Sequence, residues 1–172
     1  MTKALVLLAL LAQGGAVALA QEGATKPAPA PGATAFSFAT DIKASDVQAA
    51  LEQAKATGRD AAIRIVDAGG TVGYVGASLT YRPKGGRSGG GSHETVTEVY
   101  HILEGSAIMV TGGTTVRRTD GSFPIQDGVT RKVSKGDIII IPAGTPHGIS
   151  EVLEDLTFIE FRIDPGRTIK LK

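Results

Sequence analysis

The sequence predicts an all-β domain, an antiparallel sandwich or barrel, with one helix at its N-terminal side. Gly accounts for 23 of the 172 residues and aromatic residues for only 5%, a composition typical of short strands joined by many turns. After one amphipathic segment, the chain continues as short β-branched runs separated by Gly-containing turn signals. Hydrophobic residues make up 42% of the chain, which suits the packed core of a single domain.

Residues 1–20 have the features of an export signal. Lys3 precedes a continuous apolar run over residues 4–12, and Ala18-Leu19-Ala20 forms a small-x-small cleavage motif before Gln21. The apolar run is too short to span a bilayer comfortably, so cleavage after Ala20 is favoured over a retained membrane anchor. We therefore expect a periplasmic or secreted protein that has no membrane contact after cleavage.

Residues 21–40 are rich in Pro and Ala and have the composition of a linker. Pro27, Pro29 and Pro31 alternate with Ala, which favours an extended polyproline II conformation and leaves little surface to bury. Residues 41–172 are then predicted to form a single domain.

One helix is predicted at the start of this domain. Ser45 is a candidate N-cap, with Gln48 three residues later completing a capping box, and Gly58 is a candidate stop. The helix would bury the stripe formed by Val47, Ala50, Leu51 and Ala54.

Short strands are predicted for the rest of the domain. The run of Ile at 138–141 is apolar at both strand parities, which predicts a strand covered on both faces. A longer stretch, residues 114–133, is expected to form an excursion on the surface. The predicted strands are 61–67, 71–79, 96–103, 106–111, 131–133, 137–141, 147–151 and 156–163.

Charge and cysteine content exclude several classes of protein. Eighteen Lys and Arg against seventeen Asp and Glu give a formal net charge of +1, without the positive excess that nucleic-acid binding requires. The absence of Cys excludes disulfides, cysteine nucleophiles and thiolate metal sites.

The first motif that carries chemistry spans residues 85–105. Gly85 is followed after five residues by Gly91, and His93 lies two positions further on. Four residues separate His93 from Glu98, and six separate Glu98 from Gly105.

The second motif spans residues 136–151. Gly136 is followed by Pro142, Gly144 and His147 at fixed spacings, with Glu151 four residues after the His. Together, the two motifs resemble those of the cupin superfamily, over about residues 60–163. The resemblance implies a cupin jelly-roll β-barrel in which the two motifs lie on facing strands.

The resemblance also implies a metal site inside this barrel. His93, Glu98 and His147 would be its ligands, and two imidazoles with one carboxylate suit one divalent ion of Mn, Fe, Ni or Zn. Such a set leaves open positions for a substrate or for O₂.

Two features depart from the family pattern. Gly91 stands where the family has its first His, and Glu151 stands where it has Asn, so at most three of the usual four ligands are present. His93 and Glu98 also have opposite parity, so they converge only through a β-bulge or if His93 lies on the loop before the strand. In a competing register Glu94 replaces His93 as ligand, which would favour Mn(II).

Neighbouring residues have more ordinary interpretations. Tyr100 shares parity with Glu98 and could line the pocket, whereas His101 is expected on the outer face or at an interface. If Glu98 is not a ligand, it is expected to pair with an Arg such as Arg82 or Arg64.

The Gly-rich segment at residues 85–91 lacks the Lys and Ser or Thr of a phosphate-binding loop and leads into a strand. We expect a loop at the barrel mouth, a lid from which Arg82, Lys84 or Arg87 meets an anionic substrate.

The sequence thus favours an exported cupin that binds a divalent metal and a small-molecule ligand. If it is an enzyme, oxidoreductase, isomerase or lyase chemistry on an oxygen-bearing substrate is expected. The alternatives are a non-catalytic ligand-binding cupin whose metal site has decayed, and a structural or storage role. A homodimer formed through exposed strand edges is expected in each case.

Overall fold

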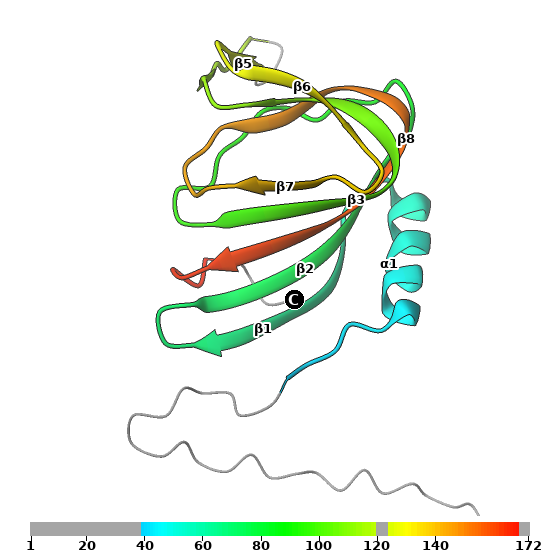
Figure 1. The fold of residues 1–172 in the computed structure, drawn as a ribbon, viewed down its shortest axis with the longest axis vertical. Coiled ribbons are helices and arrows are strands. Elements are labelled where there is room, and N and C mark those ends of the chain that lie inside the picture. The colour runs from blue at the N-terminus through cyan, green and yellow to red at the C-terminus, as the bar shows by residue number, and fades with distance from the viewer. Residues whose placement is uncertain (1–38, 120–123, 169–172) are drawn as a thin grey trace, which may run out of the picture.

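The computed structural model describes residues 39–119 and 124–168 (Figure 1). The predicted signal peptide and most of the predicted linker lie outside these residues. None of the helices in the described ranges combines the length and hydrophobicity that a bilayer-crossing helix requires.

Helix α1 spans Ala44–Thr57 and begins one residue before the proposed cap, Ser45. Ser45 lies inside the first turn, and Lys43 is the N-cap, so the predicted capping box is wrong. Asp46 caps this end instead, because its carboxylate accepts a hydrogen bond of 3.0 Å from the Lys43 N–H close to the positive end of the helix dipole. Gly58 ends the helix as predicted, with φ of 64°.

The strands form one antiparallel sheet in the order β1-β2-β8-β3-β6, with β7 paired to β3 and a small separate β4–β5 pair. In Figure 1 the long strands β3 and β8 bend, so the sheet curls into a barrel with α1 on its outer side. Residues 39–119 and 124–168 thus form the predicted all-β jelly roll with a single helix. The strands are β1 (Ala61–Gly69), β2 (Gly73–Arg82), β3 (Thr97–Thr111), β4 (Thr114–Thr115), β5 (Ile125–Gln126), β6 (Val129–Ser134), β7 (Ile138–Ile141) and β8 (His147–Asp164).

Strands β3 and β8 are each longer than predicted. Two expected strands merge into β3 and two into β8, because the bends in both are β-bulges that leave the ladder intact. Gly105 lies in the bent part of β3 with φ of 76°, and a Cβ built there would lie 2.1 Å from the Asp155 carbonyl oxygen. This position therefore requires Gly.

Two apolar clusters hold the fold together. A small one joins α1 to the sheet, where Ala50 and Ala54 pack with Ala61 of β1 and Leu79 of β2. A larger one fills the barrel and consists of Tyr100, Ile102, Ala107, Met109, Val133, Ile139, Ile141, Ile149, Val152, Leu156 and Phe158.

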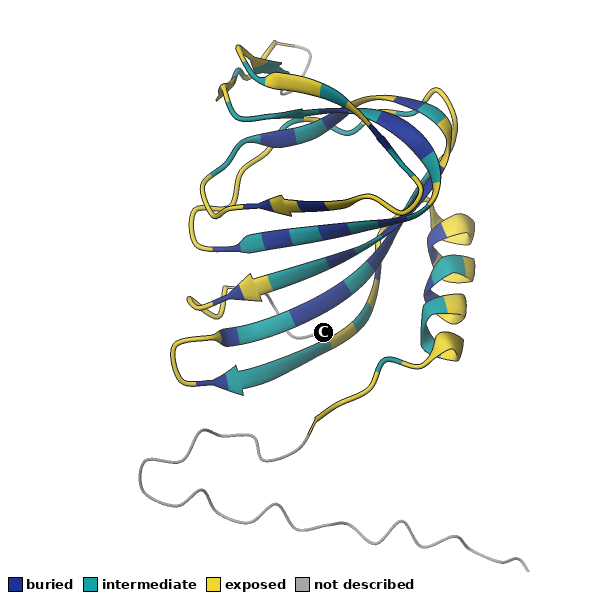
Figure 2. Ribbon diagram, viewed as in Figure 1, coloured by how far each residue is buried: buried dark blue, intermediate teal, exposed yellow. Residues whose placement is uncertain are grey.

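Strand β7 is covered on one face only, so the prediction that both faces are covered is wrong. Ile139 and Ile141 point into the barrel, while Ile138 and Ile140 are 64% and 68% exposed. Figure 2 shows this alternation along β7. The register places further apolar residues of β3 and β8 on the same outward side, and we call this surface the outer apolar face: Val99, Ile138, Ile140, Ile159, Phe161 and Ile163.

Candidate metal centre

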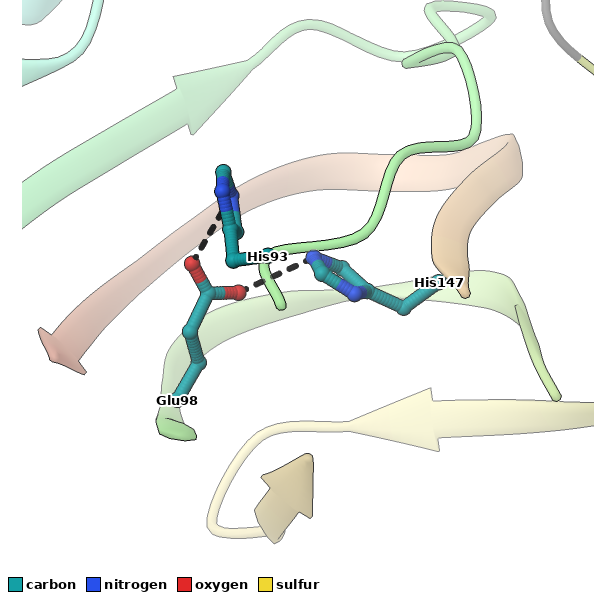
Figure 3. A group of neighbouring side chains, drawn as sticks. All are labelled: His93, Glu98 and His147. Atoms are coloured by element: carbon teal, nitrogen blue, oxygen red, sulfur yellow. Dashed lines mark ion pairs between the residues drawn. The ribbon is translucent and has the colours of Figure 1, made fainter. Parts of the chain in front are cut away.

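Three different segments bring His93, Glu98 and His147 together (Figure 3). His93 lies on the loop before β3, Glu98 is the second residue of β3, and His147 is the first residue of β8. Because His93 precedes the strand, its parity relative to Glu98 no longer prevents convergence. The sequence left two explanations open, a β-bulge between His93 and Glu98 or a position of His93 on the loop before the strand. The structure shows the second.

Backbone hydrogen bonds fix the loop that carries His93. Gly91 and His147 exchange two of them, at 3.0 and 2.8 Å, and the Gly144 N–H donates to the His93 carbonyl at 2.7 Å. The first motif is thereby tied directly to the second. The two imidazoles are positioned by backbone geometry as well as by their own side-chain contacts.

The carboxylate of Glu98 lies between the two imidazoles. Oε1 is 3.3 Å from His93 Nε2, and Oε2 is 2.9 Å from His147 Nε2. One ligand atom from each residue can be chosen so that all three lie within 4.8 Å of one another. The side chain of Glu98 is 1% exposed, that of His147 is 10% exposed and that of His93 is 44% exposed.

Neighbouring groups orient both buried members of the group. The Arg162 Nε–H donates to Glu98 Oε1 at 2.9 Å, and the Tyr100 hydroxyl donates to Glu98 Oε2 at 3.0 Å. His147 Nδ1 lies 2.9 Å from the Thr145 carbonyl oxygen, an acceptor, so Nδ1 carries the proton. Such contacts typically orient the ligands of a metal.

These contacts give Glu98 and His147 opposite pKa shifts. Burial would raise the pKa of Glu98, but the hydrogen bond and charge of His147, with Arg162 and Tyr100, lower that pKa to about 2. Burial would likewise lower the pKa of His147, yet its bonds to Glu98 and Thr145 raise it overall. Burial lowers the pKa of His93.

The arrangement fits a divalent cation. With Nδ1 protonated, a neutral His147 presents the Nε2 lone pair to a carboxylate oxygen at 2.9 Å, which is favourable only if a proton or a cation lies between them. Two ligand atoms that are each about 2.1 Å from one ion lie roughly 3 Å apart. Glu98 Oε2 is 2.9 Å from His147 Nε2, and the other carboxylate oxygen, Oε1, is 3.3 Å from His93 Nε2. The donor set of two imidazole nitrogens and a carboxylate suits Mn, Fe, Ni or Zn.

A cavity of about 180 Å³ opens beside this group. Its lining includes His93, His147 and Gly91. The other lining residues are of mixed character. The polar ones are Asp60, Thr80, Arg82, Ser88, Glu160 and Arg162, and the others are Gly89, Tyr100, Met109, Gly148, Ile149 and Phe158.

Other expectations for this region have mixed outcomes. Glu94 is exposed and lies outside the cluster, whereas Tyr100 lines the cavity as expected. The proposed Arg partners of Glu98 are wrong: Arg82 pairs with Asp60 and Arg64 with Asp46, and Arg162 takes their place because it lies directly opposite Glu98 in the β3–β8 register.

The Gly-rich segment is more firmly held than the expected lid. Backbone hydrogen bonds join Gly85 and Gly86 to Val152, and Ser88 to Ile149, so the segment runs along β8. Ser88, Gly89 and Gly91 line the cavity. Of the three cations expected to meet a substrate, Arg82 lines the cavity, whereas Lys84 and Arg87 do not.

Sequence reasoning missed Glu160 and Arg162. Both lie on the inward side of β8, where Glu160 is 5% exposed and its carboxylate contacts the Arg162 Nε. Burial raises the pKa of Glu160 to about 7, against the charge of Arg162 and with the charge of Glu98 adding to the rise. In the sequence these two residues alternate with Ile159, Phe161 and Ile163, which shows that they share one face of a strand. The same alternation fits a strand whose apolar residues face the interior and whose charged residues face outward.

Comparisons with known proteins find similarity among solved structures. No protein-family model and no curated protein matches the chain. Similar solved structures include a Bacillus halodurans protein (21% identity, 53% of this chain and 63% of that chain, TM-score 0.42). A cupin protein from Bacteroides fragilis is also similar (19% identity, 57% of this chain and 72% of that chain, TM-score 0.41). So is KdgF from Halomonas sp. (17% identity, 60% of this chain and 78% of that chain, TM-score 0.44). The chain thus spans less than two thirds of the Bacillus halodurans protein.

The described residues form a small antiparallel jelly roll. Its candidate metal centre retains the second His, the Glu and the final His of the motif pattern, with Gly91 in place of the first His.

Proposed function

We propose that this protein is an exported cupin that binds one divalent transition metal through His93, Glu98 and His147 and holds a small oxygen-bearing ligand beside it. The observation that carries the proposal is the convergence of two imidazole Nε2 atoms on one buried carboxylate at the wall of a cavity. Periplasmic or secreted localisation remains part of the proposal and rests on residues 1–20.

A bound metal would act as a Lewis acid toward an oxygen of the ligand. The chain supplies the setting for that chemistry. Arg162 and Tyr100 hold the Glu98 carboxylate, and Thr145 holds the His147 ring. Met109, Ile149 and Phe158 line the cavity with apolar surface that excludes water from part of it. Oxidoreductase, isomerase and lyase reactions are each compatible with such a site.

The test is elemental analysis of protein purified without a histidine tag. We expect about one metal ion per chain in the wild type and its loss in His93→Ala and His147→Ala. His101→Ala is the matched control, because His101 lies on β3 at the parity opposite to Glu98 and should leave the metal content unchanged. Wild-type protein that takes up none of Mn, Fe, Ni or Zn would contradict the proposal.

A second candidate is a non-catalytic binding protein whose metal site has decayed. Gly91 favours it, because the position of the family's first His is occupied by a residue with no side chain. This candidate predicts that a small ligand binds equally well with and without added metal. The first candidate predicts that ligand binding depends on the metal.

A further inference from the structure

Arg162 places a positive charge beside the candidate metal ligands. Its Nε–H donates to Glu98 Oε1 at 2.9 Å, and the same oxygen is 3.3 Å from His93 Nε2. Burial is the largest cause of the lowered pKa of His93, and the charge of Arg162 lowers that pKa further, against the charge of Glu98. A metal ion bound by His93, Glu98 and His147 would meet the same repulsion, because it too is a cation close to Arg162.

Glu160 brings the opposite charge to the same place. It is 5% exposed, lines the cavity and forms an ion pair with the Arg162 Nε. Burial lowers the pKa of His147, but its hydrogen bonds and the charges of Glu98 and Glu160 raise that pKa overall. Glu160 lies outside the group of three candidate ligands, so its effect on a bound metal would be indirect.

The β3–β8 ladder fixes the order of these charges. Glu98 pairs with Arg162 and Tyr100 pairs with Glu160, so Arg162 and Glu160 lie two residues apart on the inward side of β8. The carboxylate of Glu98, the guanidinium of Arg162 and the carboxylate of Glu160 thus follow one another within a single ladder. We call these three residues the charged triad.

The net charge of the triad determines how strongly the site attracts a divalent cation. With all three groups ionised the triad has one excess negative charge, and a bound divalent cation changes this to one excess positive charge. Without the charge of Glu160, the loaded site would have two excess positive charges. Glu98 and Glu160 are 1% and 5% exposed, so water and salt screen these charges only weakly.

We propose that Glu160 raises the metal affinity of the centre by neutralising Arg162, the residue that holds the Glu98 carboxylate. Glu160 is a positioning residue that acts through Arg162 and is not itself a ligand. With its charge neutralised, Arg162 orients Glu98 without repelling the metal. The inference rests on the proposed function, because it concerns the same metal site, and it adds a residue outside the ligand set on which that site depends.

The test measures the affinity for Co(II) by competition with a chelator, since Co(II) accepts the same imidazole and carboxylate donors. The assay is set at pH 8, above the pKa of about 7 to which burial raises Glu160. Glu160→Gln keeps the shape of the side chain and an oxygen that accepts from Arg162, but it loses the charge. We expect it to weaken Co(II) binding about 10- to 100-fold, as is typical of groups that contact metal ligands from outside. An affinity equal to that of the wild type would overturn the inference.

Two further measurements separate this role from ligation and from a loss of shape. Glu160→Asp keeps the charge on a shorter side chain and should recover part of the lost affinity. The visible absorption spectrum of bound Co(II) should be the same in Glu160→Gln and in the wild type, because the ligands are unchanged. A different spectrum, or an equal loss of affinity in Glu160→Asp and Glu160→Gln, would overturn the inference.

Asp60→Asn is the matched control. Asp60 also lines the cavity and pairs with an Arg, since Arg82 Nη1 donates to its carboxylate at 2.8 Å. Within the described residues Arg82 is not among the partners of Glu98, and the Asp60 side chain is 45% exposed. Loss of this screened charge should change the Co(II) affinity less than about threefold. A loss as large as that in Glu160→Gln would overturn the role assigned to Arg162.

A double variant tests whether Glu160 acts through Arg162. Adding Arg162→Met to Glu160→Gln removes the positive charge that Glu160 no longer neutralises, so the double variant should bind Co(II) more tightly than Glu160→Gln alone. Weaker binding by a folded double variant would overturn the inference. Melting curves identify the folded samples, and the comparison of Glu160→Gln, Glu160→Asp and Asp60→Asn stands if the double variant does not fold.

The wild type distinguishes the two proposals. Wild-type protein that binds no metal ion contradicts the proposed function. Wild-type protein that binds Co(II) with an affinity that Glu160→Gln does not change contradicts this inference alone.

Discussion

Arg162 and Glu98 face each other across the β3–β8 ladder, and the guanidinium Nε–H donates to the buried carboxylate at 2.9 Å. Glu160 contacts the same Nε from two positions away on β8, so one cation serves two carboxylates. Burial raises the pKa of Glu160, and the charge of Glu98 adds to the rise, whereas the hydrogen bond and charge of His147, with Arg162, keep Glu98 ionised. The interior of the barrel therefore contains an asymmetric pair of acids beside the candidate metal ligands.

Glu98→Gln should abolish metal binding and destabilise the protein. The amide keeps the shape of the side chain, but Arg162 and His147 lose the charge that balances them in a buried setting. We expect the free energy of unfolding to fall by about 3 kcal/mol, typical of a broken buried ion pair. Urea unfolding and elemental analysis measure the two effects. Glu94→Gln, at an exposed position, should change neither.

Stability of the metal-stripped protein should fall as pH rises from about 5 to 7.5. The pKa of Glu160 is raised from its ordinary 4.5 to about 7, so between these values the folded protein holds a proton that the unfolded chain has released. Protonated Glu160 therefore contributes fully to the stability of the folded protein below about pH 4.5. That contribution is lost as the pH rises to about 7, the pKa of Glu160 in the folded protein. Urea midpoints at both pH values should show the fall in wild type and a smaller one in Glu160→Gln. An identical slope in the two proteins would refute this assignment.

Gly91→His should increase the affinity for metal. A Cβ built at Gly91 has no atom within 4 Å, and Gly91 lines the cavity next to His147, so an added imidazole has room. A further ligand of this kind should raise the affinity by about tenfold or more, measured by competition with a chelator. Gly91→Ala, which adds a side chain without a ligand atom, should leave the affinity unchanged.

The outer apolar face predicts a homodimer. The register also places Thr97 and His101 of β3 on this side, and no Asp, Glu, Lys or Arg stands among the outward positions paired over residues 97–101 of β3, so two copies could meet here around a two-fold axis. Ile140→Asp should convert the dimer to a monomer in light scattering. Val129→Asp is the control, since Val129 is equally exposed at 67% but lies on β6, which pairs with the opposite half of β3. A dimer that persists in Ile140→Asp would exclude this face as the interface.

Fixed motif spacings made the barrel and the cluster of His93, Glu98 and His147 predictable. Turn signals and β-branched runs located most strands, although the bulged bends of β3 and β8 appeared as breaks, because a bulge and a loop share the same residues. The position of His93 on a loop was one of two predicted routes, and only the backbone contacts of Gly91 and Gly144 show which applies.

The orientation of β8 could not be predicted from its pattern. Alternation between apolar and charged residues normally places the apolar side inward. Here Glu160 and Arg162 line the cavity, and Ile159, Phe161 and Ile163 face outward. The same inversion left Ile138 and Ile140 exposed on β7. The alternation allows either set of side chains to face the barrel interior. Which set does so depends on how the neighbouring strands pack against β8.

The position of β8 between β2 and β3 also has a consequence for how the chain folds. The β1–β2 hairpin is local, but β2 completes its other edge only with β8, where Tyr74 pairs with Asp164, ninety residues later. Closing so long a loop before any pairing is gained makes folding slow, on a scale of milliseconds to seconds. Until the last strand arrives, the inner edge of the hairpin has open backbone hydrogen-bonding groups, so the newly made chain is most prone to aggregation before residue 164 is available.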